Sequence, residues 1–174
     1  MRMTALSVGL VGFVGLAGLL VASPALAGVK AGDRAREVRT VRTEKGKKIR
    51  IRDYRGKVLV VTFGASWCPP CKKELHALEK VARRIRTAKH PVRFLAVNVD
   101  STKAKGVAFM KQFNLECVLA GYDPQGTAKN TYNPPTMPST YVIDKHGVVK
   151  WMHKGYRPGD EKAIAKKVME LVGK

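Results

Sequence analysis

The chain has 174 residues, a length that fits one globular domain with an ordinary hydrophobic core. Its formal net charge is +20, from 33 Lys and Arg against 13 Asp and Glu. Such an excess indicates either a solvated basic surface or contact with anionic membranes or acidic proteins. The sequence shows no internal repeat and no recognised nucleic-acid-binding module, so nucleic acid is not an expected partner.

Residues 1–27 have the pattern of a secretory signal peptide. Arg2 supplies the positive start, residues 5–22 form an uncharged apolar run, and Ala25-Leu26-Ala27 matches a small-x-small cleavage pattern. The sequence therefore predicts export and a single soluble domain over residues 28–174 in the periplasm or another extracytoplasmic space. The apolar run is also long enough for the alternative of an uncleaved membrane anchor.

A β-hairpin is predicted within an N-terminal extension that covers residues 28–57. Apolar and polar residues alternate on both sides of the turn residues Lys45-Gly46, which is typical of two short paired strands. The predicted hairpin spans residues 37–51, and a connecting turn leads from it to the next strand.

A buried strand and a helix are predicted next. Residues 58–63 form a β-branched and almost wholly apolar run, which is typical of a strand buried on both faces. From Cys71 onward the apolar residues fall on one stripe at helical spacing, and the Lys and Arg residues lie mostly off it. Pro69 and Pro70 fit the first helical turn, where a missing N–H costs little.

Two cysteines lie at this strand-to-helix junction, in the motif Trp67-Cys68-Pro69-Pro70-Cys71. Unpaired N–H groups and the helix dipole stabilise a thiolate at a helix start, so Cys68 is expected to be the nucleophile. Cys71, one turn further on, is expected to release the captured substrate by dithiol exchange. A structural disulfide and half of a zinc site are the alternatives, although the chain has no second Cys-x-x-Cys pair.

The second half of the chain predicts a β-α-β unit and then a β-hairpin. The predicted elements are a strand at 92–99, a helix at about 102–114 capped by Asp100-Ser101-Thr102, a strand or buried edge at 115–120, a short helix at 128–132, strands at 140–144 and 148–152, and a helix from Asp160. The strand at 92–99 should run parallel to that at 58–63, because a right-handed crossover joins them. Cys117, the odd cysteine, is predicted to pack as a small hydrophobic residue, with pairing between chains as the alternative.

These motifs together resemble the thioredoxin superfamily, and within it the bacterial extracytoplasmic thiol-disulfide oxidoreductases of the TlpA type, which include the cytochrome c maturation reductases. The resemblance covers residues 36–172. It is carried by the buried strand, the Trp-Cys-x-x-Cys motif, and three further segments: Lys72-Lys73-Glu74, residues 95–100 and Met137-Pro138. It implies an α/β, thioredoxin-like fold, with a central mixed β-sheet flanked by helices and an N-terminal β-hairpin.

The resemblance also implies roles for residues outside the cysteine pair. Pro138 would be a cis-proline facing the disulfide, and Met137 and Trp67 would bind substrate beside it. Thr62 stands where thioredoxin itself holds a buried aspartate, which leaves the role of base open. Glu74 would then exchange a proton with Cys71, or it would only complement the helix dipole as an acid near the helix start.

The sequence thus predicts an exported, monomeric reductase of disulfides in other exported proteins. By the resemblance, its substrates would be proteins such as apocytochrome c or a copper-site cysteine pair, its electrons would come from a membrane thiol donor, and it would need no cofactor or metal. One alternative is a general oxidant that forms disulfides. Another is a Cu(I) carrier that uses Cys68, Cys71 and Met137 as soft ligands.

Overall fold

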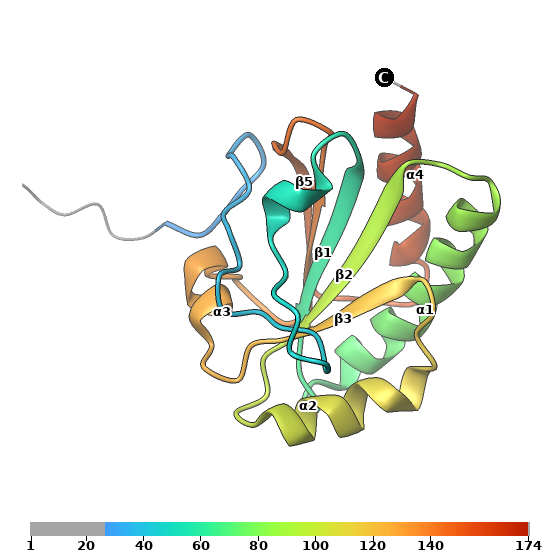
Figure 1. Ribbon diagram of the computed structural model, residues 1–174. Helices are drawn as coiled ribbons and strands as arrows, with labels where there is room; N and C mark the ends of the chain where they lie inside the picture. Colours follow the sequence, from blue (N-terminus) through green and yellow to red (C-terminus); the bar gives the residue numbers. More distant parts are fainter. Residues whose placement is uncertain (1–26, 174) are drawn as a thin grey trace, which may run out of the picture.

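A mixed five-stranded β-sheet forms the centre of the computed structural model, which describes residues 27–173. The strands are β1 (Val58–Gly64), β2 (Val92–Asn98), β3 (Val118–Tyr122), β4 (Ser139–Ile143) and β5 (Val149–Lys154), in the order β3-β2-β1-β4-β5 (Figure 1). β1 pairs in parallel with β2, and β2 with β3, whereas β4 and β5 are antiparallel to their neighbours. The predicted parallel arrangement of the first two strands is confirmed. The predicted signal peptide lies outside the described residues, except for Ala27.

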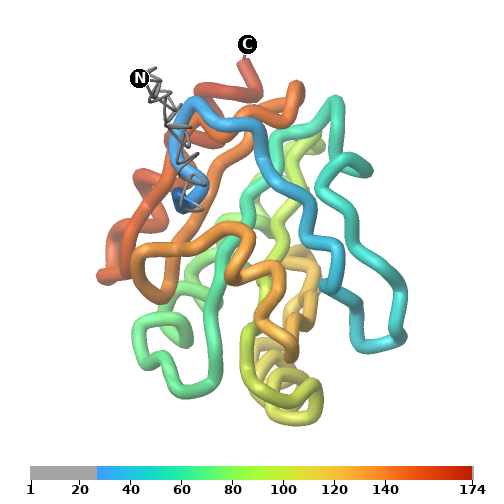
Figure 2. Tube along the Cα trace, turned by 90° about the vertical axis from the view of Figure 1, so that its left-hand side faces the viewer, coloured from blue at the N-terminus to red at the C-terminus, as the bar shows by residue number. Residues whose placement is uncertain are grey.

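Within residues 27–173, four helices and two short 3₁₀ segments surround the sheet. The helices are α1 (Pro69–Thr87), α2 (Lys103–Met110), α3 (Thr127–Tyr132) and α4 (Asp160–Val172), and the 3₁₀ segments are η1 (Ile51–Tyr54) and η2 (Lys111–Phe113). α1, α2 and α4 cover one face, and α3 with the N-terminal segment covers the other (Figures 1 and 2). Within residues 27–173, no helix is both long enough and apolar enough to cross a membrane.

β1 has a hydrophobic core on each of its two faces. Val58 and Val60 pack in the core beneath α1 and α4, and Leu59, Val61 and Phe63 pack in the core beneath the N-terminal segment. Successive side chains of a strand point to opposite faces, so an apolar residue at every position is what a strand covered on both sides requires. The predicted thioredoxin-like fold is confirmed. β1 ends at Gly64, shortly before the cysteine motif.

The predicted N-terminal hairpin is not confirmed as a pair of strands. The chain does turn at Lys45-Gly46, but only an isolated bridge joins Arg42 to Lys48. Two backbone hydrogen bonds, from Thr43 N to Lys47 O and from Ile49 N to Val41 O, flank this bridge, and the backbone of Arg42 also pairs with Tyr122 at the end of β3 through N–H···O bonds of 3.2 and 2.8 Å. The apolar residues of this segment are buried against the sheet, so their pattern reflects burial in the core rather than a β-ladder.

β3 begins at Val118 rather than at residue 115. The buried carboxylate of Glu79, on α1, accepts hydrogen bonds from the backbone N–H groups of Glu116, Cys117 and Val118 at 3.0–3.2 Å. Residues 116 and 117 therefore bond to the helix instead of to β2. The prediction of a strand over 115–120 was wrong at its start, because sequence periodicity does not show this contact.

Candidate active site

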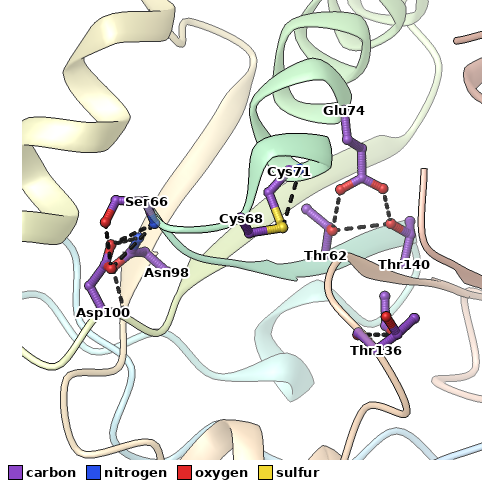
Figure 3. Close-up of a disulfide and its surroundings, with 10 residues drawn as sticks. Thr62, Ser66, Cys68, Cys71, Glu74, Asn98, Asp100, Thr136 and Thr140 are labelled. Atoms are coloured by element: carbon purple, nitrogen blue, oxygen red, sulfur yellow. Dashed lines mark hydrogen bonds between the residues drawn. A yellow bond between two sulfur atoms is a disulfide. The ribbon is translucent and has the colours of Figure 1, made fainter. Parts of the chain in front are cut away.

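The two cysteines of the Cys-x-x-Cys motif form a disulfide at the start of α1 (Figure 3). Cys68 is the N-cap residue of the helix, and its Sγ accepts a hydrogen bond from the backbone N–H of Cys71 at 3.3 Å. Both residues are buried, Cys68 with 4% and Cys71 with 1% of its surface exposed. A reduced Cys68 at this position would face unpaired N–H groups and the positive end of the helix dipole, which stabilise a thiolate.

Gly64, the last residue of β1, leaves room for Cys71. A Cβ atom added to Gly64 would lie 3.1 Å from both Cβ and Sγ of Cys71, which is closer than ordinary van der Waals contact. Gly64 was not among the site residues predicted from the sequence. Its signal was a glycine at the end of an otherwise apolar strand, a position that often marks a close approach.

Glu74 lies inside the protein, on the turn of α1 that follows Cys71. Its surface is 1% exposed, and Thr62 Oγ1 donates to Glu74 Oε2 at 2.7 Å. Thr140 Oγ1, on β4, donates to Glu74 Oε1 and lies 3.1 Å from Thr62 Oγ1, which closes the triangle seen in Figure 3. The alternative of a first-turn acid that only complements the dipole does not fit a carboxyl buried in this way.

Burial raises the pKa of Glu74 to about 7, against the opposing effect of the hydrogen bonds from Thr140 and Thr62. Removal from water disfavours the charged form, so the group can gain and lose a proton near neutral pH. Two further charges act on it from β5 and α4: His153 favours the carboxylate and Asp160 opposes it. These two residues bond to each other, with His153 Nε2 2.8 Å from Asp160 Oδ2.

Asp100 holds the loop that carries Trp67 and Cys68. Its buried carboxylate accepts hydrogen bonds from the backbone N–H of Ser66 at 3.0 and 3.2 Å and from Ser66 Oγ at 2.8 Å (Figure 3). Asn98 Nδ2 donates to it at 2.7 Å. Asp100 was predicted as part of a helix cap, but the capping side chain of α2 is that of Thr102. Asp100 instead links the end of β2 to the loop after β1.

Trp67 and Met137, two of the residues expected to bind substrate, lie next to residues of the Cys-x-x-Cys motif. Trp67 is 64% exposed next to Cys68. The Met137–Pro138 peptide bond is cis, as the resemblance implied, and Pro138 O accepts a hydrogen bond from Gly155 N at 2.8 Å. Met137 is half-buried and lines a groove of about 580 Å³ together with Pro70, which precedes Cys71. The fold thus brings Met137 beside the start of α1, although the two are far apart in sequence.

Cys117 is separate from this pair. It is half-buried against the core beneath α1, and burial raises the pKa of its thiol. Its backbone N–H is held by Glu79, so its position follows from the start of β3 rather than from the active-site loop. Within residues 27–173, no group of three or more His, Cys, Asp or Glu side chains is arranged to hold a metal ion.

The fold and the site define a thioredoxin-like protein with a Cys-x-x-Cys disulfide at the start of its first long helix. The family model described as Redoxin matches residues 30–169. The chain belongs to the Redoxin family.

Two curated relatives are named for thiol-disulfide chemistry. The chain is 35% identical over 111 residues to the thiol-disulfide oxidoreductase ResA of Geobacillus kaustophilus, a match that covers 64% of this chain and 62% of the relative. It is 28% identical over 119 residues to the thiol:disulfide interchange protein DsbE of Allochromatium vinosum, with 68% of this chain and 62% of that protein covered. The match therefore spans less than two thirds of either relative.

A solved structure has the same fold over almost all of the described residues. It is the crystal structure of a protein assigned as thiol:disulfide interchange protein DsbE from Chlorobium tepidum. The TM-score is 0.76 at 26% identity, and the match covers 84% of this chain and 100% of the other.

Proposed function

We propose that this protein is a thiol-disulfide oxidoreductase that works through Cys68 and Cys71. The observation that carries the proposal is a disulfide whose first sulfur caps a helix and accepts the N–H of the second cysteine. That N–H donor stabilises a Cys68 thiolate once the disulfide is reduced, and the thiolate is the reactive form in exchange. The names of the relatives, thiol-disulfide oxidoreductase and thiol:disulfide interchange protein, support the same chemistry.

The cycle begins with the reduced pair. The Cys68 thiolate attacks one sulfur of a substrate disulfide, the substrate S–S bond breaks, and the first substrate sulfur leaves as a thiolate that takes a proton from solvent. Cys71 then gives up its proton and attacks Cys68 Sγ, which expels the second substrate thiol and forms the Cys68–Cys71 disulfide. The substrate gains two electrons, and the protein is oxidised by two.

Glu74 is the proton acceptor that this second step requires. It is three residues from Cys71 on the same helix, and residues with this spacing lie on neighbouring parts of one helix face. Its pKa of about 7 lets the carboxylate accept a proton and then release it near neutral pH. Thr62 and Thr140 hold the carboxyl in one place in either protonation state, because a hydroxyl can both donate and accept hydrogen bonds.

The expected direction is reduction of disulfides in exported proteins. The predicted signal peptide supports export, and the resemblance to TlpA-type proteins supports substrates such as apocytochrome c or a copper-site cysteine pair, with a membrane thiol donor. The ionised carboxyl of Glu74 supports the reducing direction. It repels negative charge on Cys71, so it does not stabilise the reduced protein with both cysteines as thiolates. A strongly oxidising protein would favour its reduced, thiolate-bearing state.

Trapping of the mixed disulfide tests the proposal. In Cys71→Ser, Cys68 should capture a disulfide-containing protein and fail to release it, so a covalent complex should appear on a non-reducing gel and vanish with a reductant. Cys68→Ser is the matched control and should capture nothing. Capture that persists in Cys68→Ser and disappears in Cys117→Ser would show that the reactive sulfur is a different one.

A further inference from the structure

One face of α1 carries basic side chains at a spacing of four residues. Lys72, His76, Lys80 and Arg84 are all exposed, and they form a stripe that starts directly after Cys71. From Lys72 to Arg84 the stripe extends about 18 Å at 1.5 Å per residue. We call these four residues the basic stripe. It places a line of positive or protonatable groups along the helix that begins at the disulfide.

The acids of α1 do not neutralise this stripe. Glu74 is buried against Thr62 and Thr140, and Glu79 is buried against the backbone before β3, where it pairs with Arg83. Among the described residues, no salt bridge involves Lys72, Lys80 or Arg84. Like charges at this spacing repel one another and destabilise a helix. A negatively charged ligand would remove that repulsion.

The stripe borders a groove between α1 and the start of α4. The groove has a volume of about 520 Å³, and its apolar lining comes from Ala77, Val81 and Pro158. Its one carboxylate is that of Glu161, which accepts hydrogen bonds from Tyr156 Oη at 2.6 Å and from Gly159 N at 2.9 Å. We call this cavity the basic groove. It combines basic side chains along α1 with apolar lining residues.

The basic groove meets the groove beside the disulfide. Tyr156 lines both of them, and Pro70 and Met137 line the second. Figure 1 shows α1 and α4 side by side on one face of the sheet, with the loop before α4 near the start of α1. A polypeptide bound at Met137 would thus pass Tyr156 and continue along the basic stripe.

We infer that the basic groove binds an acidic segment of the protein whose disulfide is exchanged at Cys68. This inference rests on the proposed function and specifies a feature of its substrate. Lys80 and Arg84 lie about 18 and 24 Å along the helix from Cys68, and an extended chain covers about 3.3 Å per residue, so acidic residues about five to seven positions from the substrate cysteine would lie over this half of the stripe. A hollow groove with an apolar floor suits a polypeptide better than a membrane, because a flat lipid surface would contact only the rim.

The test uses the reduced full-length protein and two peptides. Each peptide has one cysteine as a mixed disulfide with thionitrobenzoate, flanked at the stated spacing by Glu residues in one peptide and by Ser residues in the other. Attack of Cys68 on the peptide sulfur releases the coloured thiolate, which gives the rate directly. At low salt we expect the acidic peptide to react about tenfold faster, because opposite charges accelerate association.

Two double variants with the same charge change separate the groove from overall charge. Lys80→Glu with Arg84→Glu should abolish the preference for the acidic peptide. Lys45→Glu with Lys47→Glu changes two exposed lysines of the N-terminal segment, which covers the opposite face of the sheet, and should keep the preference. An equal loss in both variants, or no preference in the unaltered protein, would overturn the inference.

Two further measurements distinguish the possible failures. The rate with the small neutral disulfide 2-hydroxyethyl disulfide reports Cys68 alone: if it is zero, the proposed function fails, and if it is normal while the peptide preference is absent, only the groove inference fails. Binding to vesicles of phosphatidylcholine and phosphatidylglycerol is the last measurement. If the groove variant loses vesicle binding and the protein shows no peptide preference, the stripe is a membrane contact and the inference is wrong.

Discussion

The buried carboxyl of Glu74 links the active site to the stability of the fold. In an unfolded chain the pKa of this carboxyl has the ordinary glutamate value of 4.5, whereas burial in the folded protein raises it to about 7. Between these values the folded protein keeps a proton that the unfolded chain has lost, so rising pH destabilises the folded state. The contribution of this protonated carboxyl to the free energy of unfolding is fully present below about pH 4.5 and is lost as the pH rises through about 7.

Glu74→Gln should remove this dependence. The unaltered protein should lose about 3 kcal/mol of unfolding free energy between about pH 5 and pH 8, whereas the variant, which mimics the protonated carboxyl, should stay nearly constant. Urea unfolding at several pH values measures it, with Glu116→Gln, at an exposed acid, as the control. A variant with the same pH profile as the unaltered protein would show that Glu74 is not the titrating group.

Residues of the site differ in how well the sequence reveals them. Cys68 and Cys71 follow from spacing alone, because two thiols at a strand-to-helix junction lie within reach of each other. Gly64 does not, because its contact with Cys71 depends on how the helix returns over the strand end. Glu74 was recognised as a candidate by resemblance, but only the structure shows that its carboxyl is buried against Thr62 and Thr140 and is not a surface acid.

At the scale of elements, one buried carboxylate ties β2 to the loop that carries the active site. Asp100 follows β2, and its partner Ser66 follows β1, 34 residues earlier. Parallel neighbouring strands bring their carboxyl ends to the same edge of the sheet, which is why these two residues meet. The hydrogen bonds to Asp100 therefore fix the position of Trp67 and Cys68 relative to the sheet.

Asp100→Asn should loosen that loop. The amide has one acceptor oxygen in place of two, and its NH₂ group faces the Asn98 Nδ2 donor, so a buried donor is left unpaired. We expect a loss of about 2 kcal/mol in unfolding free energy and slower disulfide exchange. Asp53→Asn is the matched control, since its exposed pair with Arg50 should contribute less than about 1 kcal/mol. Equal effects in the two variants would contradict this role.

The errors at the element scale have one cause. The sequence predicted β1, β2 and the long helix well, because their burial depends on a regular repeat of apolar residues. At residues 37–51 only the isolated bridge between Arg42 and Lys48 forms, and β3 starts later than predicted; in both places long-range contacts influence the backbone pairing. The backbone of Arg42 pairs with Tyr122, and the Glu79 carboxylate accepts hydrogen bonds from the backbone N–H groups of residues 116–118. Such contacts produce no periodic pattern of apolar residues in the sequence.

At the scale of the whole molecule, the two redox states define a thermodynamic cycle. The reduction potential of the Cys68–Cys71 pair is linked to the difference in folding stability between the oxidised and the reduced protein. About 30 mV corresponds to 1.4 kcal/mol for this two-electron couple. A protein that forms disulfides in others is more stable when reduced, because its thiolate is strongly held. A reductant lacks that excess stabilisation.

We expect the oxidised protein to be at least as stable as the reduced one. Helix N–H groups stabilise the Cys68 thiolate, but the buried carboxylate of Glu74 opposes negative charge at Cys71, and the exposed lysines of α1 act through water and are screened by salt. Urea unfolding with and without a reductant, at pH 8 where Glu74 is ionised, measures the difference. A reduced form more stable by about 3 kcal/mol would overturn the assignment as a reductase and favour the general oxidant. Glu74→Gln should shift the balance toward the reduced form, because it removes the negative charge that Cys71 would otherwise face.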